Sequence, residues 1–158
     1  MKNTILIKWN ELQQQIDLRN YYMGESAKRK EIDADTIQSC NDDKELLLMF
    51  ARRACNELVT AVALRFRNIT CEANDEYIEF AFESNSAQLE HLIPILKQAV
   101  TDYLVNETTM HWLLLRQPQM AQPYISLRST LYSNVQHLLA KFYNRNSPRR
   151  RPTDLAGI

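Results

Sequence analysis

Apolar residues recur at steps of three and four along four stretches of the chain, which is the spacing of one face of an α-helix. In the longest stretch, 86–117, the apolar positions are Leu89, Leu92, Ile93, Leu96, Val100, Tyr103, Leu104, Met110 and Leu114. This pattern predicts a long central helix. Pro94 removes one backbone donor near its start, so either the helix kinks there or its regular part begins at about Ile93. The polar residues at 106–109 leave a break into two helices open.

Three further helices are expected from the same spacing. The first covers about 11–23 and ends at Gly24, because glycine commonly closes a helix. The second lies at about 43–67, with an aspartate as its cap. The last covers about 123–144, and its core positions are Tyr124, Leu127, Leu131, Val135, Leu138 and Phe142.

The period changes to two between the second helix and the central one, which indicates β-structure. Ile78, Phe80 and Phe82 alternate with more polar neighbours, so we expect a β-hairpin near 69–83. A lone hairpin is marginal in water and must pack on the helices or pair with a partner strand. A short strand at 4–9 is also compatible with the pattern. The predicted fold class is mainly α, a bundle of about four to five helices with one hairpin, leaning towards α+β.

Length and composition narrow the function classes. The 158 residues are most simply one helical domain over 1–144, followed by an extended basic tail over 145–158. Two glycines in the whole chain argue against phosphate-binding loops and dinucleotide folds. Nineteen acidic and nineteen basic residues balance, so no overall charge attracts the domain to nucleic acid or a membrane. The three cysteines lack the spacing of a zinc site or a disulfide framework, which favours a reduced, cytosolic setting.

Candidate chemistry is sparse. Glu107 lies one helical turn before His111, and such a pair can share a metal or act as a base. A lone pair at this spacing is more often a surface contact, and we interpret it as one. An enzyme that uses these two residues is the least favoured reading. We therefore predict no catalytic, cofactor-binding or metal-binding residue, and no enzyme.

Two segments are candidates for binding other molecules. The first is the proline-flanked tail, with Arg145, Arg149, Arg150 and Arg151. The tail is either simply solvated, docked on an acidic groove of a neighbouring subunit, or in contact with a nucleic-acid backbone. No aromatic residue interleaves with these arginines, so stacking on bases is not supported. The second segment is the hairpin, through Tyr77, Ile78, Phe80 and Phe82.

Several phrases of the sequence occur together in a recognisable order. They are IKWNEL with YYMG over 7–24, YIEF over 77–80, AVTDYLV with MHWLLL over 99–115, and RNSPRRRP over 145–152. This set resembles small virion structural proteins encoded by phages and prophages of Bacteroides-type bacteria. The size and the helical plan with one hairpin are similar to those of head-tail connector, or adaptor, proteins, which form a ring beneath the portal.

The resemblance implies a structural subunit of a connector or neck ring that joins the portal to the tail and continues the DNA channel. Its expected partners are copies of itself and the portal and tail proteins, with DNA nearby and no membrane. It implies a place in the virion, after assembly in the bacterial host cytoplasm, and no cofactor. The alternative is a small nucleic-acid-binding or regulatory module that uses the arginine-rich tail, although the balanced charge argues against direct DNA contact.

Overall fold

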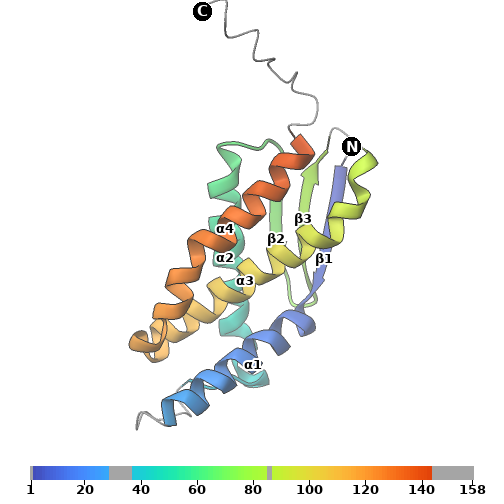
Figure 1. Cartoon of the computed structure of the whole chain (residues 1–158). Coiled ribbons are helices and arrows are strands. Elements are labelled where there is room, and N and C mark those ends of the chain that lie inside the picture. Colours follow the sequence, from blue (N-terminus) through green and yellow to red (C-terminus); the bar gives the residue numbers. More distant parts are fainter. Residues whose placement is uncertain (1, 29–36, 85–86, 144–158) are drawn as a thin grey trace, which may run out of the picture.

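The computed structural model describes residues 2–28, 37–84 and 87–143 (Figure 1). The elements in chain order are β1 (Lys2–Lys8), α1 (Trp9–Lys28), η2 (Asn41–Asp43), α2 (Lys44–Ala63), β2 (Thr70–Ala73), β3 (Tyr77–Glu83), η3 (Ala87–Leu92), α3 (Ile93–Arg116), η4 (Pro118–Met120) and α4 (Gln122–Tyr143). The η elements are short pieces of 3-10 helix: η2 and η4 have three residues each, and η3 has six residues with a kink at Leu89. The prediction of a mainly helical fold with a small β element is confirmed. None of the described helices is long and apolar enough to cross a membrane.

The β element is a three-stranded antiparallel sheet in the order β1-β3-β2. The predicted hairpin of β2 and β3 is confirmed, and the third strand comes from the chain's beginning. In the register, Ile5 lies opposite Phe80, and Ile7 lies opposite Ile78. All four side chains are buried. The hairpin therefore meets its need for a partner strand within its own chain, because β1 pairs along the full length of β3.

The central position of β3 corrects one expectation from the sequence. Ile78, Phe80 and Phe82 were candidates for contact with another protein, but each is fully buried in the domain core. Tyr77 is half-buried. Since β3 has a strand on both sides, its backbone is also paired. Ile78, Phe80 and Phe82 therefore hold the sheet against the helices and present no side-chain surface to a partner, whereas Tyr77 keeps part of its surface exposed.

Helix α3 lies at the centre of the helical layer and contacts α1, α2, α4 and strand β1 (Figure 1). It begins at Ile93, so the second of the two readings around Pro94 is confirmed, with the proline in the first turn where it is tolerated. The helix does not break at 106–109. Every residue from Tyr103 to Leu113 is buried, because neighbours cover this part of α3 on several sides.

The ends of two helices differ from the prediction. Helix α1 passes through Gly24 and ends at Lys28, because Asn20, Gly24 and Ala27 continue its buried face. Helix α2 ends at Ala63, earlier than predicted. The chain then turns at Asn68, ahead of β2; the backbone φ of Asn68 is 58°, a left-handed value that asparagine tolerates.

The expected core face of α4 is buried only in part. Tyr124, Val135, Leu139 and Phe142 are buried, whereas Leu127 is 47 % exposed and Leu131 and Leu138 are half-buried. The reason is that α4 lies at the edge of the helical layer and packs mainly on α3, so its buried stripe is narrow (Figure 1).

The end of α4 is tied to the sheet by one hydroxyl group. The Tyr143 hydroxyl donates a hydrogen bond to the Arg67 carbonyl oxygen at 2.8 Å and accepts one from the Glu83 N–H at 3.1 Å. Its ring packs on Phe66, with the centroids 5.1 Å apart. The same side chain therefore joins α4, the turn after α2 and the end of β3.

We expect Tyr143→Phe to lower the free energy of unfolding by about 1 kcal/mol, because it keeps the ring contact and removes the hydroxyl that serves two backbone groups. Urea unfolding followed by circular dichroism measures the change. Tyr21→Phe, at a half-exposed ring on α1, is the matched control and should leave stability unchanged. Equal stability of the Tyr143→Phe and wild-type proteins would contradict the assigned role.

Candidate functional site

A cluster of ionisable side chains lies where α2, α3 and α4 meet. Glu57 comes from α2, Glu107 and His111 come from consecutive turns of α3, and Arg128 comes from α4. Glu107 has no exposed surface and His111 is 9 % exposed. Helical spacing places Glu107 and His111 on one face of α3, and the packing of α2 on α3 brings Glu57 to them.

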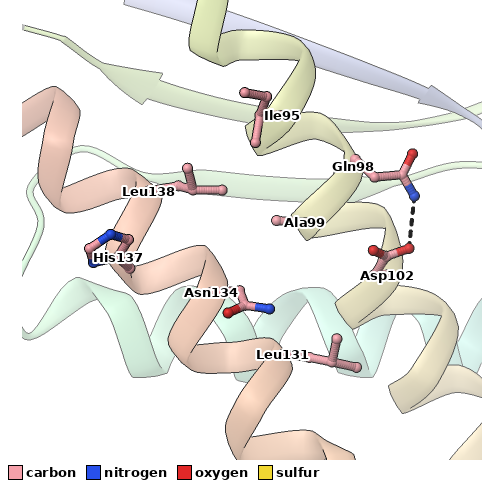
Figure 2. Close-up of a pocket in the computed structure, with 8 residues that line it drawn as sticks. All are labelled: Ile95, Gln98, Ala99, Asp102, Leu131, Asn134, His137 and Leu138. Atoms are coloured by element: carbon pink, nitrogen blue, oxygen red, sulfur yellow. Dashed lines mark hydrogen bonds between the residues drawn. The ribbon is translucent and has the colours of Figure 1, made fainter.

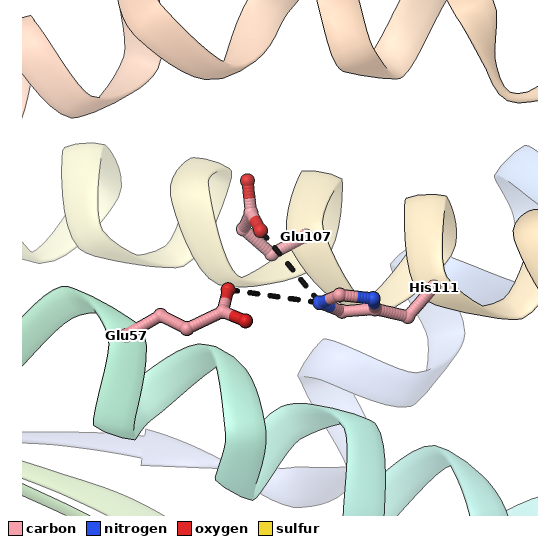
Figure 3. A group of neighbouring side chains, drawn as sticks. All are labelled: Glu57, Glu107 and His111. Atoms are coloured by element: carbon pink, nitrogen blue, oxygen red, sulfur yellow. Dashed lines mark ion pairs between the residues drawn. The ribbon is translucent and has the colours of Figure 1, made fainter.

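The three side chains converge on one point, as Figure 3 shows. The imidazole Nε2 of His111 lies 3.6 Å from Glu57 Oε2 and 3.8 Å from Glu107 Oε2. One ligand atom from each residue lies within 4.8 Å of the others. Among the described residues, none of these three atoms has a hydrogen-bond partner. Buried polar atoms without a partner are rare in native proteins, so the convergence needs an explanation.

Arginines hold the outer oxygens of both carboxylates. Arg128 Nε donates to Glu107 Oε1 at 2.7 Å, and Arg53 Nε donates to Glu57 Oε1 at 3.1 Å. Arg128 is 44 % exposed, so its guanidinium reaches the cluster from the surface. Each carboxylate therefore binds an arginine through its Oε1 and directs its Oε2 towards His111. Glu57 Oε2 also lies 3.8 Å from Arg128 Nη2.

Burial changes the protonation of the two groups on α3. It raises the pKa of the Glu107 carboxyl; the bond from Arg128 acts in the opposite direction, and the nearby Glu57 adds to the rise. Burial lowers the pKa of His111. The negative charge of Glu57 raises this pKa in part, whereas the positive charges of Arg53 and Arg128 lower it further. At neutral pH His111 is therefore a neutral imidazole, which carries a lone pair on one ring nitrogen.

Two hollows flank Arg128 and give solvent access to the cluster. The larger, of about 500 Å³, is lined by Phe50, Arg53, Glu57, Met110, His111, Leu114, Leu115, Ile125 and Arg128. The second, of about 420 Å³, is lined by Glu57, Ala61, Tyr103, Glu107, Ile125, Arg128, Ser129 and Tyr132. Glu57 and Arg128 line both, so the cluster lies beneath a surface that is open on two sides.

A third hollow, of about 360 Å³, lies in the groove between α3 and α4 (Figure 2). Its walls are mainly apolar, and Gln98 donates a hydrogen bond to Asp102 within it at 2.8 Å. Figure 2 places His137 and Asp102 on opposite sides of the groove. These two ionisable groups therefore do not form an acid–base pair.

The interpretation of Glu107 and His111 as a surface contact is wrong, because both are buried and a third residue joins them. Glu57 was not a candidate, since it lies fifty positions before Glu107 and only the packing of α2 on α3 brings it near. The available signal was the run Asn106–Thr109, four polar residues inside an apolar helical stripe. The predicted contact residues Arg145, Arg149, Arg150 and Arg151 lie outside the described residues.

We expect Arg128→Gln to lower the free energy of unfolding by about 2 kcal/mol, because it leaves the buried Glu107 carboxylate without its closest donor. The effect is smaller than for a fully buried pair, since water reaches Arg128. Adding Glu107→Gln should recover part of the loss, which urea unfolding of the two single variants and the double variant measures. Lys141→Gln, on the exposed side of α4, is the control. Additive losses would contradict a direct interaction.

The lowered pKa of His111 predicts a loss of stability on mild acidification. The contribution of neutral His111 to the free energy of unfolding is complete above the ordinary histidine pKa of about 6.5. It is lost as the pH falls through the lower pKa of the folded state, because His111 in the unfolded chain takes up its proton at a higher pH than in the folded chain. His111→Gln should flatten this dependence, measured by urea unfolding between about pH 7.5 and 5 with a chelator present. His137→Gln, on the exposed side of α4, should keep the wild-type slope. Equal slopes for His111→Gln and the wild type would count against the assignment.

Comparison of the chain with protein-family models, with curated proteins and with solved structures finds no match. The arrangement of its own residues is therefore the main guide to its function.

Proposed function

We propose that this chain is a non-enzymatic structural subunit of a phage head-tail connector. In this role it assembles with copies of itself into a ring that joins the portal to the tail and continues the DNA channel. The observation that supports assembly is the gathering of exposed apolar side chains on two different helical surfaces. The connector setting is supported by the sequence resemblance and by the helical plan with one hairpin.

The first surface, the α1 stripe, consists of Leu18, Tyr21 and Tyr22. Their exposed fractions are 53 %, 50 % and 63 %. The spacing from Leu18 to each tyrosine is three and four residues, so the three side chains share one side of α1. The two tyrosine rings pack edge to face, with centroids 5.9 Å apart. Exposed aromatic side chains held in a fixed arrangement are typical of protein–protein interfaces.

The second surface, the α3–α4 corner, consists of Leu114, Leu115 and Ile125. Their exposed fractions are 41 %, 58 % and 38 %. The short η4 turn brings the end of α3 and the start of α4 together. Leu114, Leu115 and Ile125 line the hollow of about 500 Å³, so this corner is concave as well as apolar. Contiguous exposed apolar surface of this kind marks interaction sites more often than scattered single residues do.

Two different apolar surfaces on one molecule favour a head-to-tail contact. In such a contact the α1 stripe of one copy packs into the α3–α4 corner of the next. In a row of subunits joined in this way, the first subunit keeps one unpaired surface and the last subunit keeps the other. The row closes into a ring when the rotation from each subunit to the next adds up to a full turn. Burying the exposed half of a leucine or tyrosine contributes about 1 kcal/mol, so one contact is weak and a closed ring is stronger.

The experiment uses two variants, Leu115→Glu in the α3–α4 corner and Tyr22→Glu in the α1 stripe. Analytical ultracentrifugation should show that the wild-type chain forms concentration-dependent oligomers and that each variant is monomeric. A mixture of the two variants should form dimers and nothing larger, because each retains the surface that the other has lost. A contact between identical surfaces would not be rescued in this way.

Leu64→Glu is the matched control. Leu64 is 94 % exposed and follows the C-terminal end of α2, which Figure 1 shows far from the α3–α4 turn. It should assemble like the wild type. A wild-type chain that stays monomeric up to about 1 mM, or a loss of assembly by Leu64→Glu as large as by Leu115→Glu, would overturn the proposal.

A further inference from the structure

We propose that Glu57, Glu107 and His111 form a binding site for one divalent transition-metal cation, for which Zn²⁺ matches the donor set best. The site would hold α2 against α3. The inference stands on the geometry of the cluster and does not depend on the assembly role.

The spacing of the three inward atoms is close to that of a metal's ligands. Zinc binds histidine nitrogen and carboxylate oxygen at about 2.0–2.2 Å in tetrahedral geometry, which places neighbouring ligand atoms about 3.4 Å apart. His111 Nε2 lies 3.6 Å from Glu57 Oε2 and 3.8 Å from Glu107 Oε2. The two carboxylate oxygens lie within 4.8 Å of each other. Rotation of the glutamate side chains would therefore bring all three atoms to bonding distance around one cation.

The hydrogen-bonding capacity of the cluster also favours a cation over water. The three inward atoms are two carboxylate oxygens and the imidazole Nε2. All three are acceptors when both carboxyl groups are ionised and Nδ1 carries the proton of the neutral ring, which is the tautomer that binds a metal through Nε2. A single water molecule has two hydrogens and can satisfy only two of them. A cation binds all three, which would account for three buried atoms that make no hydrogen bond to the described residues. The one arginine contact among these three atoms is a long ion pair of 3.8 Å between Glu57 Oε2 and Arg128 Nη2.

The arginines act as the outer layer that such sites usually have. Carboxylates that bind metals are commonly held by further hydrogen bonds, which fix their orientation. Arg128 and Arg53 hold the outer oxygens of Glu107 and Glu57 in this way. Their positive charges also repel a cation, so we expect weaker binding than at a structural zinc site with four protein ligands.

The hollow of about 500 Å³ beside His111 provides a route for the cation and space for a water molecule as the fourth ligand. One nitrogen among the donors favours zinc and related transition metals over Mg²⁺, which prefers oxygen ligands only. The expected selectivity is therefore Zn²⁺ or Co²⁺ over Mg²⁺.

The test uses the full chain after treatment with a chelator. Isothermal titration calorimetry with ZnCl₂ should give one site per chain, and MgCl₂ should give none. Glu57→Gln and His111→Gln should each weaken Zn²⁺ binding at least about 100-fold, since each loses a direct ligand. His137→Gln, which removes an exposed histidine on α4, should bind like the wild type.

Co²⁺ supplies a second readout, because its visible absorption is intense in tetrahedral sites and does not depend on protein stability. The wild-type and His137→Gln proteins should show these bands, and the two ligand variants should lose them. Circular dichroism shows whether His111→Gln folds. If it does not, Glu57→Gln decides the question, because the Glu57 side chain is 32 % exposed and its substitution should disturb the core less. The absence of saturable Zn²⁺ binding, or binding that is equal in both ligand variants and the wild type, would overturn the proposal.

Discussion

The enclosure of α3 by its neighbours is the constraint on which the rest of the structure depends. A helix that is covered on several sides must bury whatever its sequence carries, and the middle of α3 carries Asn106–Thr109 and His111. Burying a carboxylate costs several kcal/mol unless a partner reaches it. Arg128 on α4 provides that partner for Glu107. The position of α4 is therefore fixed by electrostatics as well as by apolar packing.

The same constraint determines where the surface features lie. Because α3 occupies the centre, α1 and α4 lie at its sides and keep one side each open to solvent (Figure 1). The α1 stripe lies on the open side of α1. The α3–α4 corner combines Leu114 and Leu115, exposed at the end of α3, with Ile125 at the start of α4. The polar cluster and the α3–α4 corner share a wall, since Glu57, Arg128 and Ile125 line the hollows on both sides of Arg128. A substitution in the polar cluster is thus expected to alter the shape of the α3–α4 corner, and a substitution in the corner is expected to alter the cluster.

The sheet shows that a local sequence pattern can predict a strand without predicting which strand pairs with it. The alternation of Ile78, Phe80 and Phe82 predicted a hairpin with one apolar face, and the hairpin exists. The pattern could not say whether another chain or this chain supplies the neighbouring strand, since both would bury the same side chains. Pairing with β1 decides it, and it removes these residues from the set that can contact other proteins.

The sequence by itself determined the helices, the hairpin and the scarcity of catalytic motifs, because period and composition are local properties that each segment carries alone. It could also place Glu107 and His111 on one face, since they lie one turn apart on the same helix. Only the tertiary structure decided that this face is buried and that Glu57 and Arg128 complete it, because these residues come from three helices. Residues far apart in the chain converge through packing, and no single segment contains that information.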